Sequence, residues 1–125
     1  MDFRQLQDEQ RPWVARNFPG RPSWYPLLGV MEELGELAHA HLKQAQGIRY
    51  TPEEARAKKV DAVADIVTFL ADYCSAEGID LQAAVEETWQ HVRKRDWASD
   101  PMTGGRKDLP KQEHPRQPAV EKEEK

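Results

Sequence analysis

The stretch VDAVADIVTFLADYCSAE, residues 60–77, decides the fold of this chain. Read as a helix at about 100° per residue, it is apolar around most of its circumference, which is typical of a buried helix. Its polar side chains form one narrow stripe of Asp61, Asp65, Thr68 and Asp72. Because carboxylates are costly to remove from water without a partner, this stripe faces either water or a cation. The choice between the two decides what the protein does.

The composition indicates one ordinary globular domain. The chain has 125 residues, of which 32% are charged, with a net charge of −4 and a pI near 5.6. Such an acidic chain is not expected to bind nucleic acid. No apolar run approaches the ~20 residues that cross a membrane, and residues 1–12 are too polar for a secretory signal. A single cysteine, Cys74, allows neither an intrachain disulfide nor a cysteine-based zinc site. We therefore expect a cytoplasmic protein.

Helix start and stop signals divide the first half of the chain into two predicted helices. The first covers residues 2–17, and Pro12 should kink or split it. A loop rich in proline and aromatic residues follows. The second predicted helix runs from residue 25 or 26 to residue 46, where Gly47 is a natural stop.

Two further helices are predicted after Gly47. Thr51-Pro52-Glu53-Glu54 has the pattern of a capping box with proline at the first helical position, so a third helix should run from residue 52 to about residue 77. Gly78 suits the turn that ends it, and Asp80 suits the cap of a fourth helix. This fourth helix should extend to about residue 97, with Trp89 on its core-facing side.

The expected architecture is all-α, an antiparallel four-helix bundle with short connections. The third helix has more apolar circumference than three neighbours can cover, so we expect a homodimer, or a higher homo-oligomer, to complete the core. Residues 1–98 form the predicted helical domain. Residues 99–125 are rich in proline and poor in apolar side chains, which predicts a disordered C-terminal tail.

Two predicted helices carry files of carboxylates. Glu32, Glu33 and Glu36 lie three or four residues apart on the second helix, as do Asp61 and Asp65 on the third, so each set shares one face. Antiparallel packing would bring the two files together. Oxygen ligands without cysteine suit Mg²⁺ or Mn²⁺, and Mg²⁺ commonly completes its shell with waters and substrate phosphates. The pattern therefore predicts a metal site that handles phosphates.

Simpler interpretations stay open for these residues. Glu32 and Glu36 lie largely opposite the apolar side of their helix and could form a solvated face. Glu36 and His39 form a Glu-x-x-His unit, but di-iron bundles need two such units, and no second one lies on another predicted helix. The aromatic loop that contains Trp24 could fasten itself to the core or stack on a flat ligand.

Three segments together resemble a known family. They are LLGVMEELGELAHAHLK (residues 27–43), DAVADIVTFLADYC (residues 61–74) and GIDLQAAVEETWQHVRKRDW (residues 78–97). In this order they resemble the MazG-like all-α nucleoside triphosphate pyrophosphohydrolases, over roughly residues 13–97. This resemblance implies hydrolysis of a nucleoside triphosphate, often a deoxynucleotide, to the monophosphate and pyrophosphate, as nucleotide-pool house-cleaning.

The family pattern assigns the metal ligands residue by residue. Its E-x-x-E element is similar to Glu33-Leu34-Gly35-Glu36, and the last residue of its E-x-x-D element corresponds to Asp65. The first residue of that second element is Ala62 here, and Asp61 lies one position earlier. Asp61 could therefore take the missing role, or the site could be one ligand short.

The resemblance also suggests roles around the metal. Glu33, Glu36 and Asp65 would hold Mg²⁺, with Glu32 and Asp61 in support, and Glu32 or Glu33 would orient or deprotonate the attacking water. The expected substrate contacts are Lys43, Lys94 and Arg95 for the triphosphate. The candidates for stacking on the base are Trp13, Trp24, Tyr25, Trp89 and Trp97, and Asp72 could lie behind the metal ligands or contact the sugar or a basic residue. The rival hypothesis is a non-catalytic helical nucleotide-binding or regulatory module with a degraded metal site.

Overall fold

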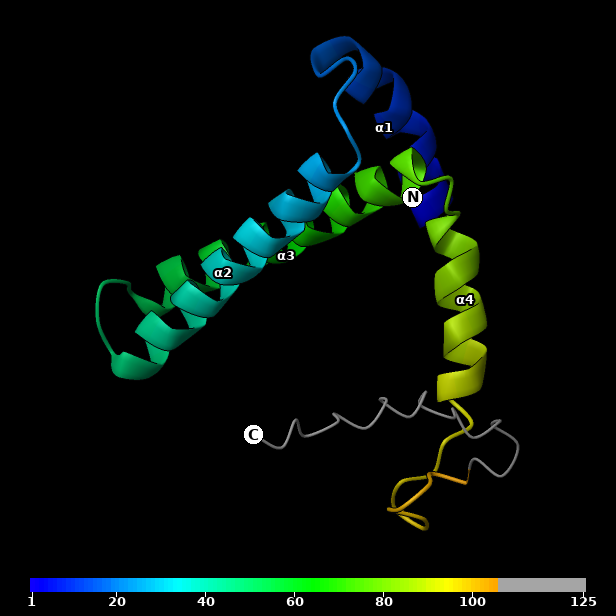
Figure 1. The fold of residues 1–125 in the computed structure, drawn as a ribbon. Coiled ribbons are helices and arrows are strands. Elements are labelled where there is room, and N and C mark those ends of the chain that lie inside the picture. The colour runs from blue at the N-terminus through cyan, green and yellow to red at the C-terminus, as the bar shows by residue number, and fades with distance from the viewer. Residues whose placement is uncertain (106–125) are drawn as a thin grey trace, which may run out of the picture. The chain divides into compact units, whose positions relative to one another are not determined.

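A computed structural model of the chain describes residues 1–105. Within these residues the elements are four helices and no strand: α1 (Phe3–Asn17), α2 (Trp24–Gln46), α3 (Pro52–Ala76) and α4 (Leu81–Val92) (Figure 1). The predicted all-α class is confirmed. None of the described helices has the length and apolar character that a membrane crossing requires.

The chain divides into two compact units, Met1–Trp89 and the part from Gln90 onward. The boundary between the two units falls inside α4. In the second unit, residues 97–105 are mainly turns, in which Asp100 accepts hydrogen bonds from the backbone N–H groups of Met102 and Thr103. This part of the predicted tail is therefore structured, and residues 106–125 lie outside the described residues.

Side-chain caps begin both α1 and α3. The Asp2 carboxylate accepts a hydrogen bond from the Gln5 backbone N–H at 2.7 Å, and the Gln5 side chain accepts one from Asp2. Thr51 and Glu54 form the same reciprocal pair at the start of α3, which confirms the capping box expected there. Pro12 lies inside α1 and does not split it, so of the two predicted effects of this proline the split is absent. Pro12 and its surroundings are exposed, so water can satisfy the carbonyl that its missing N–H leaves free.

Left-handed glycines end α2 and α3. Gly47, with φ of 68°, caps α2 as expected. After α3, Gly78 has φ of 69°, and the Ile79 N–H donates to the Cys74 carbonyl at 2.7 Å, which is the Schellman pattern. The α4 helix ends at Val92, about five residues before the predicted end. Beyond α4, the Asp96 carboxylate accepts hydrogen bonds from the backbone N–H groups of Ala98 and Ser99. These bonds take the place of those that a continued helix would make.

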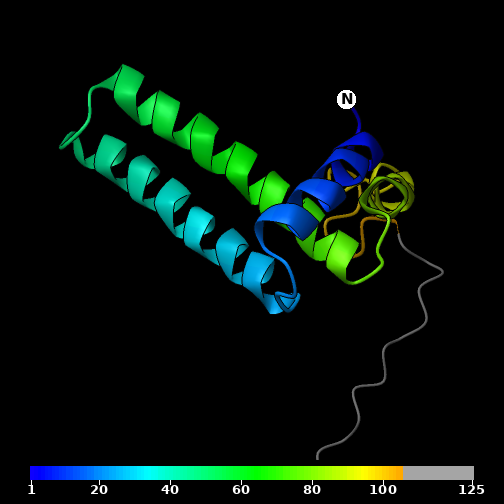
Figure 2. The same cartoon turned by 90° about the horizontal axis from the view of Figure 1, so that it is seen from above.

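The extensive helix packing of the first unit is between α2 and α3, which run antiparallel side by side (Figure 2). Their buried residues include small ones, among them Ala40 on α2 and Ala55 and Ala62 on α3. A Cβ atom added at Gly29 would lie 2.6 Å from the Phe69 ring, so the ring rests directly on the α2 backbone. Small residues thus let the two helices approach closely.

A buried glutamine joins α1 to the end of α3 and the start of α4. The Gln7 amide donates to the Ile79 carbonyl at 2.9 Å, and its oxygen accepts from the Leu81 N–H at 3.0 Å. Nearby, Arg4 and Asp80 form an exposed ion pair at 2.9 Å. Because Gln7 is only 4% exposed, its hydrogen bonds fix the α3–α4 turn against α1 and leave no buried polar atom of this side chain unpaired.

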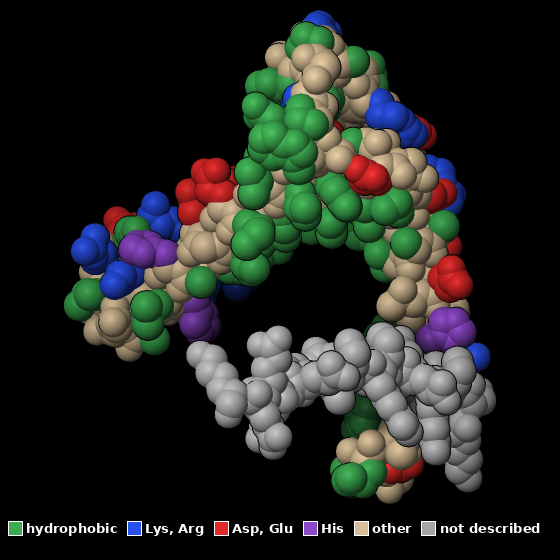
Figure 3. Space-filling model, in the orientation of Figure 1, with side chains coloured by type: hydrophobic (Ala, Val, Ile, Leu, Met, Phe, Trp, Pro, Cys, Tyr) green, Lys and Arg blue, Asp and Glu red, His purple; other side chains and the backbone are tan. Residues whose placement is uncertain are grey.

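The single chain leaves many large apolar side chains in contact with solvent. Hydrophobic side chains gather along one side of the α2–α3 pair (Figure 3). On α4, Trp89 is 57% exposed, although the sequence predicts it in the core. The largest fully buried side chain among the described residues is Pro26. The core of one chain is therefore built mainly of small residues.

Replacing Gly29 by alanine should destabilise the α2–α3 pair. The added methyl group meets the Phe69 ring, and overpacking of this kind costs about 1–3 kcal/mol. Gly35→Ala is the matched control, since nothing lies within 4 Å of its added Cβ and alanine favours the helix by roughly 0.5–1 kcal/mol. Urea unfolding followed by circular dichroism checks both variants. Equal stability changes in the two variants would contradict the close contact at Gly29.

Candidate functional site

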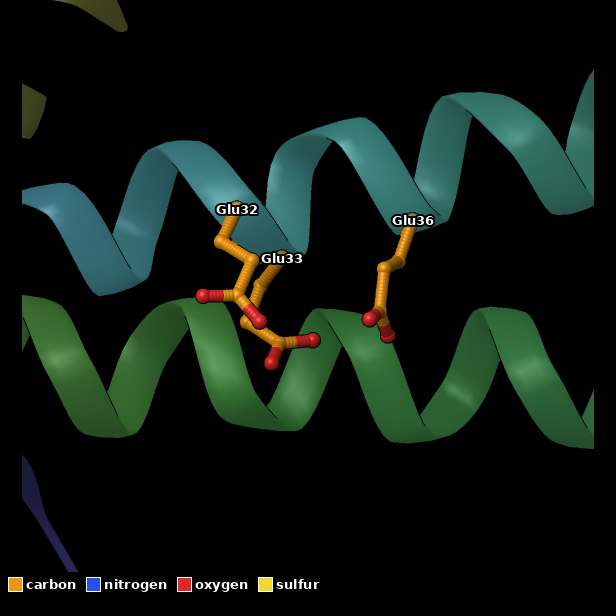
Figure 4. Close-up of side chains that lie close together, drawn as sticks. All are labelled: Glu32, Glu33 and Glu36. Atoms are coloured by element: carbon orange, nitrogen blue, oxygen red, sulfur yellow. The ribbon is translucent and has the colours of Figure 1, made fainter.

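Three glutamates of α2 form the centre of the candidate site. Carboxylate oxygens of Glu32, Glu33 and Glu36 all lie within 4.8 Å of one another (Figure 4). The spacing of three and four residues in a helix places them on adjacent turns of one face. Glu32 and Glu36 are exposed, and Glu33 is partly buried. The group is compact enough to surround one small cation, although exposed acidic groups are also common without one.

The carboxylates of α3 act on the same cluster. The pKa of Glu33 is raised above its ordinary value, first by partial desolvation and then by repulsion from Glu36, Asp65, Glu32 and Asp61. Each of these neighbours favours the neutral form of Glu33. Asp65 and Asp61 thus lie near enough to Glu33 to act on it electrostatically, whereas the group with oxygens within 4.8 Å of one another consists of the three glutamates of α2.

A cavity of about 420 Å³ borders the cluster on one side. Its walls include Glu32, Glu36 and Asp61 together with His39, Tyr50 and Lys58. The Lys58 ammonium lies over the Tyr50 ring, 5.0 Å from its centre, and His39 meets the same ring edge-on at 6.2 Å. The cavity therefore combines carboxylates with a lysine and an imidazole, a set of groups suited to a phosphorylated ligand and its metal ion.

A second cavity, of about 280 Å³, reaches Asp65 from the other direction along α3. Aromatic side chains form much of its lining, including Trp13 and Phe18 from the α1 region and Phe69 from α3. The carboxylates thus border one cavity that contains a lysine and another that is aromatic.

Two residues that the sequence predicts as substrate contacts, Lys43 and Trp24, do not line the cavities beside the acidic cluster. The Lys43 ammonium donates to the Gln46 side chain at 3.1 Å and does not line the cavity beside Glu36. Lys94 and Arg95 belong to the unit that begins at Gln90. The Trp24 ring packs against Tyr25, with centroids 4.5 Å apart, and lines neither of the two cavities.

Asp72 has a basic partner within the chain. Its carboxylate, 9% exposed, forms an ion pair with Arg21, whose side chain is 18% exposed. Of the alternatives predicted for Asp72, the structure thus shows the contact with a basic residue. Arg21 also lies over the Phe18 ring, 5.0 Å from its centre.

Sequence reasoning missed Lys58, Tyr50 and Arg21. Lys58 lies three residues before Asp61 in a polar stretch, and helical spacing alone would have placed both on one face. Arg21 lies in a loop, where no periodicity links it to Asp72. Ala62, which occupies the position where the family pattern has the first glutamate of its E-x-x-D element, is buried, with 2% of its surface exposed. Asp61 is exposed and reaches the cluster from the neighbouring position.

Comparison of the chain with protein-family models, with curated proteins and with solved structures finds no match in any of the three.

Replacing Glu33 by glutamine should raise the thermal stability of the metal-free protein. The raised pKa means that ionised Glu33 disfavours the folded state at neutral pH, so removing its charge removes repulsion. We expect a Tm increase of about 1–3 °C at pH 7 and low salt. The difference between the variant and the wild type should shrink as the pH falls through the pKa of Glu33, because wild-type Glu33 then becomes neutral too.

Differential scanning calorimetry measures this effect. Glu9→Gln, which removes an exposed acid from α1, is the matched control for the change in net charge. An unchanged or lower Tm for Glu33→Gln would show that the five carboxylates do not repel one another as described.

Proposed function

We propose that the protein is a Mg²⁺-dependent nucleoside triphosphate pyrophosphohydrolase. It would convert a ribo- or deoxynucleoside triphosphate and water to the monophosphate and pyrophosphate, and so remove surplus or non-standard nucleotides from the cytoplasmic pool. The observation that supports the proposal is the compact group of α2 glutamates, on which Asp65 and Asp61 of α3 act electrostatically, bordered by a cavity that contains a lysine and by an aromatic cavity. The resemblance of the sequence segments supports the same activity.

The residues present fit a Mg²⁺ ion, and Mn²⁺ would suit the same oxygens. The donors are hard carboxylates, and the repulsion that raises the pKa of Glu33 is what a divalent cation would relieve. In this proposal Glu33, Glu36 and Asp65 are the ligands, and Glu32 and Asp61 support them. The bound ion would neutralise negative charge on the phosphate oxygens during the reaction.

The carboxylates also provide a base. Hydrolysis adds a water oxygen to a phosphorus atom at the α–β bridge, breaks the bond from that phosphorus to the bridging oxygen, and releases pyrophosphate. A carboxylate that is not fully committed to the metal can take the proton of this water. Glu32 or Glu33 fills that role, because each lies within the cluster.

Lys58 and His39 are the groups best placed for the terminal phosphates. Both line the cavity that also contains Glu32, Glu36 and Asp61. An ammonium beside the metal ligands would balance the charge that develops on the leaving pyrophosphate. This assignment puts Lys58 in the role that the sequence suggests for Lys43.

A second copy of the chain would complete the fold as a MazG-like bundle. Leu37, Val60 and Val63 line an apolar groove of about 720 Å³, and Val60 and Val63 are 54% and 49% exposed. Leu34, one turn before Leu37, is 55% exposed. Stable interfaces cover about 800 Å² on each partner, and the same surface on a second copy offers the matching apolar side chains.

Ala62 favours a rival function, a nucleotide-binding or regulatory module without catalysis. Its methyl group is buried where the family pattern has a ligand, so the metal would be held by fewer carboxylates. Such a module would bind nucleotide without requiring metal and without producing pyrophosphate. Isothermal titration calorimetry with and without Mg²⁺ separates this behaviour from that of an enzyme.

The activity is tested by pyrophosphate release from a panel of ribo- and deoxynucleoside triphosphates. We expect Mg²⁺-dependent turnover that falls at least 100-fold in Glu36→Ala, since removal of a group that stabilises transition-state charge costs about this much. Lys58→Ala should lose less, and Lys43→Ala, outside the cavity, should retain wild-type turnover. If neither Mg²⁺ nor Mn²⁺ gives release above the Glu36→Ala level, the enzyme proposal is wrong.

The homodimer is tested by sedimentation equilibrium at micromolar concentration. We expect the wild type to sediment as a dimer or larger, and Val63→Lys to sediment as a monomer because it places a charge in the apolar groove. Ile48→Lys, which adds the same charge at an exposed loop residue, is the control and should retain the wild-type mass. A monomeric wild type would remove this part of the proposal.

A further inference from the structure

Lys58 and Asp61 line the same cavity beside the glutamate cluster, yet they form no ion pair with each other. They lie three residues apart on α3, a spacing that brings opposite charges together on one helix face. Asp8 and Arg11, with the same spacing on α1, do form an ion pair, at 2.6 Å. None of the ion pairs among the described residues includes Lys58. A different contact holds the Lys58 ammonium.

The aromatic ring of Tyr50 provides that contact. The Lys58 ammonium lies over the ring face, 5.0 Å from its centre, and His39 meets the ring edge-on at 6.2 Å. At an exposed site, the attraction of a cation to an aromatic face is similar in strength to an exposed ion pair. The Tyr50 ring can therefore compete with Asp61 for the ammonium, provided that the ring itself is held in place.

The α2–α3 loop holds the backbone of Tyr50 from both sides. The Tyr50 N–H donates to the Ile48 carbonyl at 2.9 Å, which closes a tight turn around Arg49. Arg49 has φ of 68°, a left-handed conformation that residues other than glycine rarely adopt. On the other side, Thr51 caps α3 in its reciprocal pair with Glu54. The backbone position of Tyr50 is thus fixed by contacts that do not involve Lys58.

The charge of Asp61 matters to the acidic cluster. Asp61 is one of the carboxylates whose repulsion contributes to the raised pKa of Glu33. Because Ala62 occupies the position where the family pattern has a glutamate, Asp61 is the carboxylate that remains at this turn of α3. An ion pair with Lys58 would offset the charge of Asp61 and place a cation beside the glutamates. Both effects would weaken the binding of a divalent cation.

We infer that Tyr50 is a positioning residue, which holds the Lys58 ammonium away from Asp61 and so leaves the carboxylate free for the metal ion and the ammonium free for the phosphates. With the ring removed, Lys58 pairs with Asp61, and its charge opposes the metal ion instead of assisting the reaction. This inference rests on the proposed function for the metal ion and the phosphates. It adds a residue to which the sequence pattern assigns no role.

Titration with Mn²⁺ alone tests the inference. Electron paramagnetic resonance of free Mn²⁺ gives the affinity without any substrate or turnover. Tyr50→Leu should bind Mn²⁺ about three- to tenfold more weakly than the wild type, because Lys58 then pairs with Asp61 beside the ion. Tyr50→Phe keeps the aromatic face and should bind Mn²⁺ as the wild type does. Equal affinities of the wild type and Tyr50→Leu, or no Mn²⁺ binding by the wild type, would overturn the inference.

A second substitution separates positioning from a merely structural role. If Tyr50→Leu acts through Lys58, then adding Lys58→Met should return the Mn²⁺ affinity at least to the wild-type value. Lys59→Met is the matched control, because it removes the same charge from an ammonium that donates to the Gln44 side chain at 2.5 Å and does not line the cavity. In the Tyr50→Leu background, this control should leave the affinity low. Failure of Lys58→Met to restore the affinity, or equal restoration by Lys59→Met, would reject the positioning role.

The contact between Lys58 and Tyr50 can also be measured in the metal-free protein. Protons that lie over an aromatic face resonate upfield, so the proton spectrum of the wild type should contain one lysine ε-methylene signal displaced upfield. This signal should be absent in Lys58→Met and in Tyr50→Leu and present in Tyr50→Phe. A wild-type spectrum without a displaced lysine signal would contradict the contact and, with it, the inference.

The outcome is separable from that of the proposed activity. Mn²⁺ binding with the expected dependence on Tyr50 and Lys58, in a protein that releases no pyrophosphate, would uphold the inference and reject the enzyme. Pyrophosphate release and Mn²⁺ affinity that are both unchanged in Tyr50→Leu would uphold the enzyme and reject the inference.

Discussion

The close approach of α2 and α3 is the constraint on which the rest of the first unit depends. Small residues permit it, most directly Gly29, where the Phe69 ring occupies the space that any side chain would need. With larger residues at these positions, the helix axes would separate, and the carboxylates of the two helices would no longer act on one another. The same contact fixes Phe69 as a wall of the aromatic cavity. The packing of α2 against α3 and the positions of the carboxylates and of Phe69 therefore depend on the same contact.

This close approach explains both the shortage of large buried side chains and the exposed apolar surface. Helices that meet through alanine and glycine bury little area per residue, so hydrophobic stabilisation within one chain is limited. The larger side chains, such as Leu34 and Val63, lie outside the contact and remain exposed. A chain built this way would gain stability if those side chains were covered.

Much of the fold could be predicted from the sequence because its boundaries are set locally. The Thr51–Glu54 capping box and the glycines that end α2 and α3 act within a few residues, and each lies where the pattern places it. The end of α4 could not be predicted, because it depends on Asp96 competing for backbone N–H groups beyond an amphipathic pattern that continues. The exposure of Trp89 depends on how much of the chain packs around it, which periodicity does not report.

The candidate site shows the same division between local and tertiary information. Helical spacing predicted that Glu32, Glu33 and Glu36 share a face, and their carboxylates do lie close together, with Asp65 and Asp61 of α3 acting on Glu33 electrostatically. The partners that come from other elements escaped prediction. Arg21 reaches Asp72 from a loop, and Gln10 reaches the Thr68 carbonyl from α1.

The aspartates of α3 also show why one stripe need not have one role. Asp61 is exposed, Asp65 is partly buried among other carboxylates, and Asp72 is buried against Arg21. A regular file on one helix meets a different neighbour at each turn: solvent and Lys58 near the loop, the glutamates of α2 in the middle, and the α1 region at the end. The question of water or cation therefore has a separate answer for each residue. In the central part of the stripe, Asp65 and the glutamates of α2 repel one another, and this repulsion contributes to the raised pKa of Glu33.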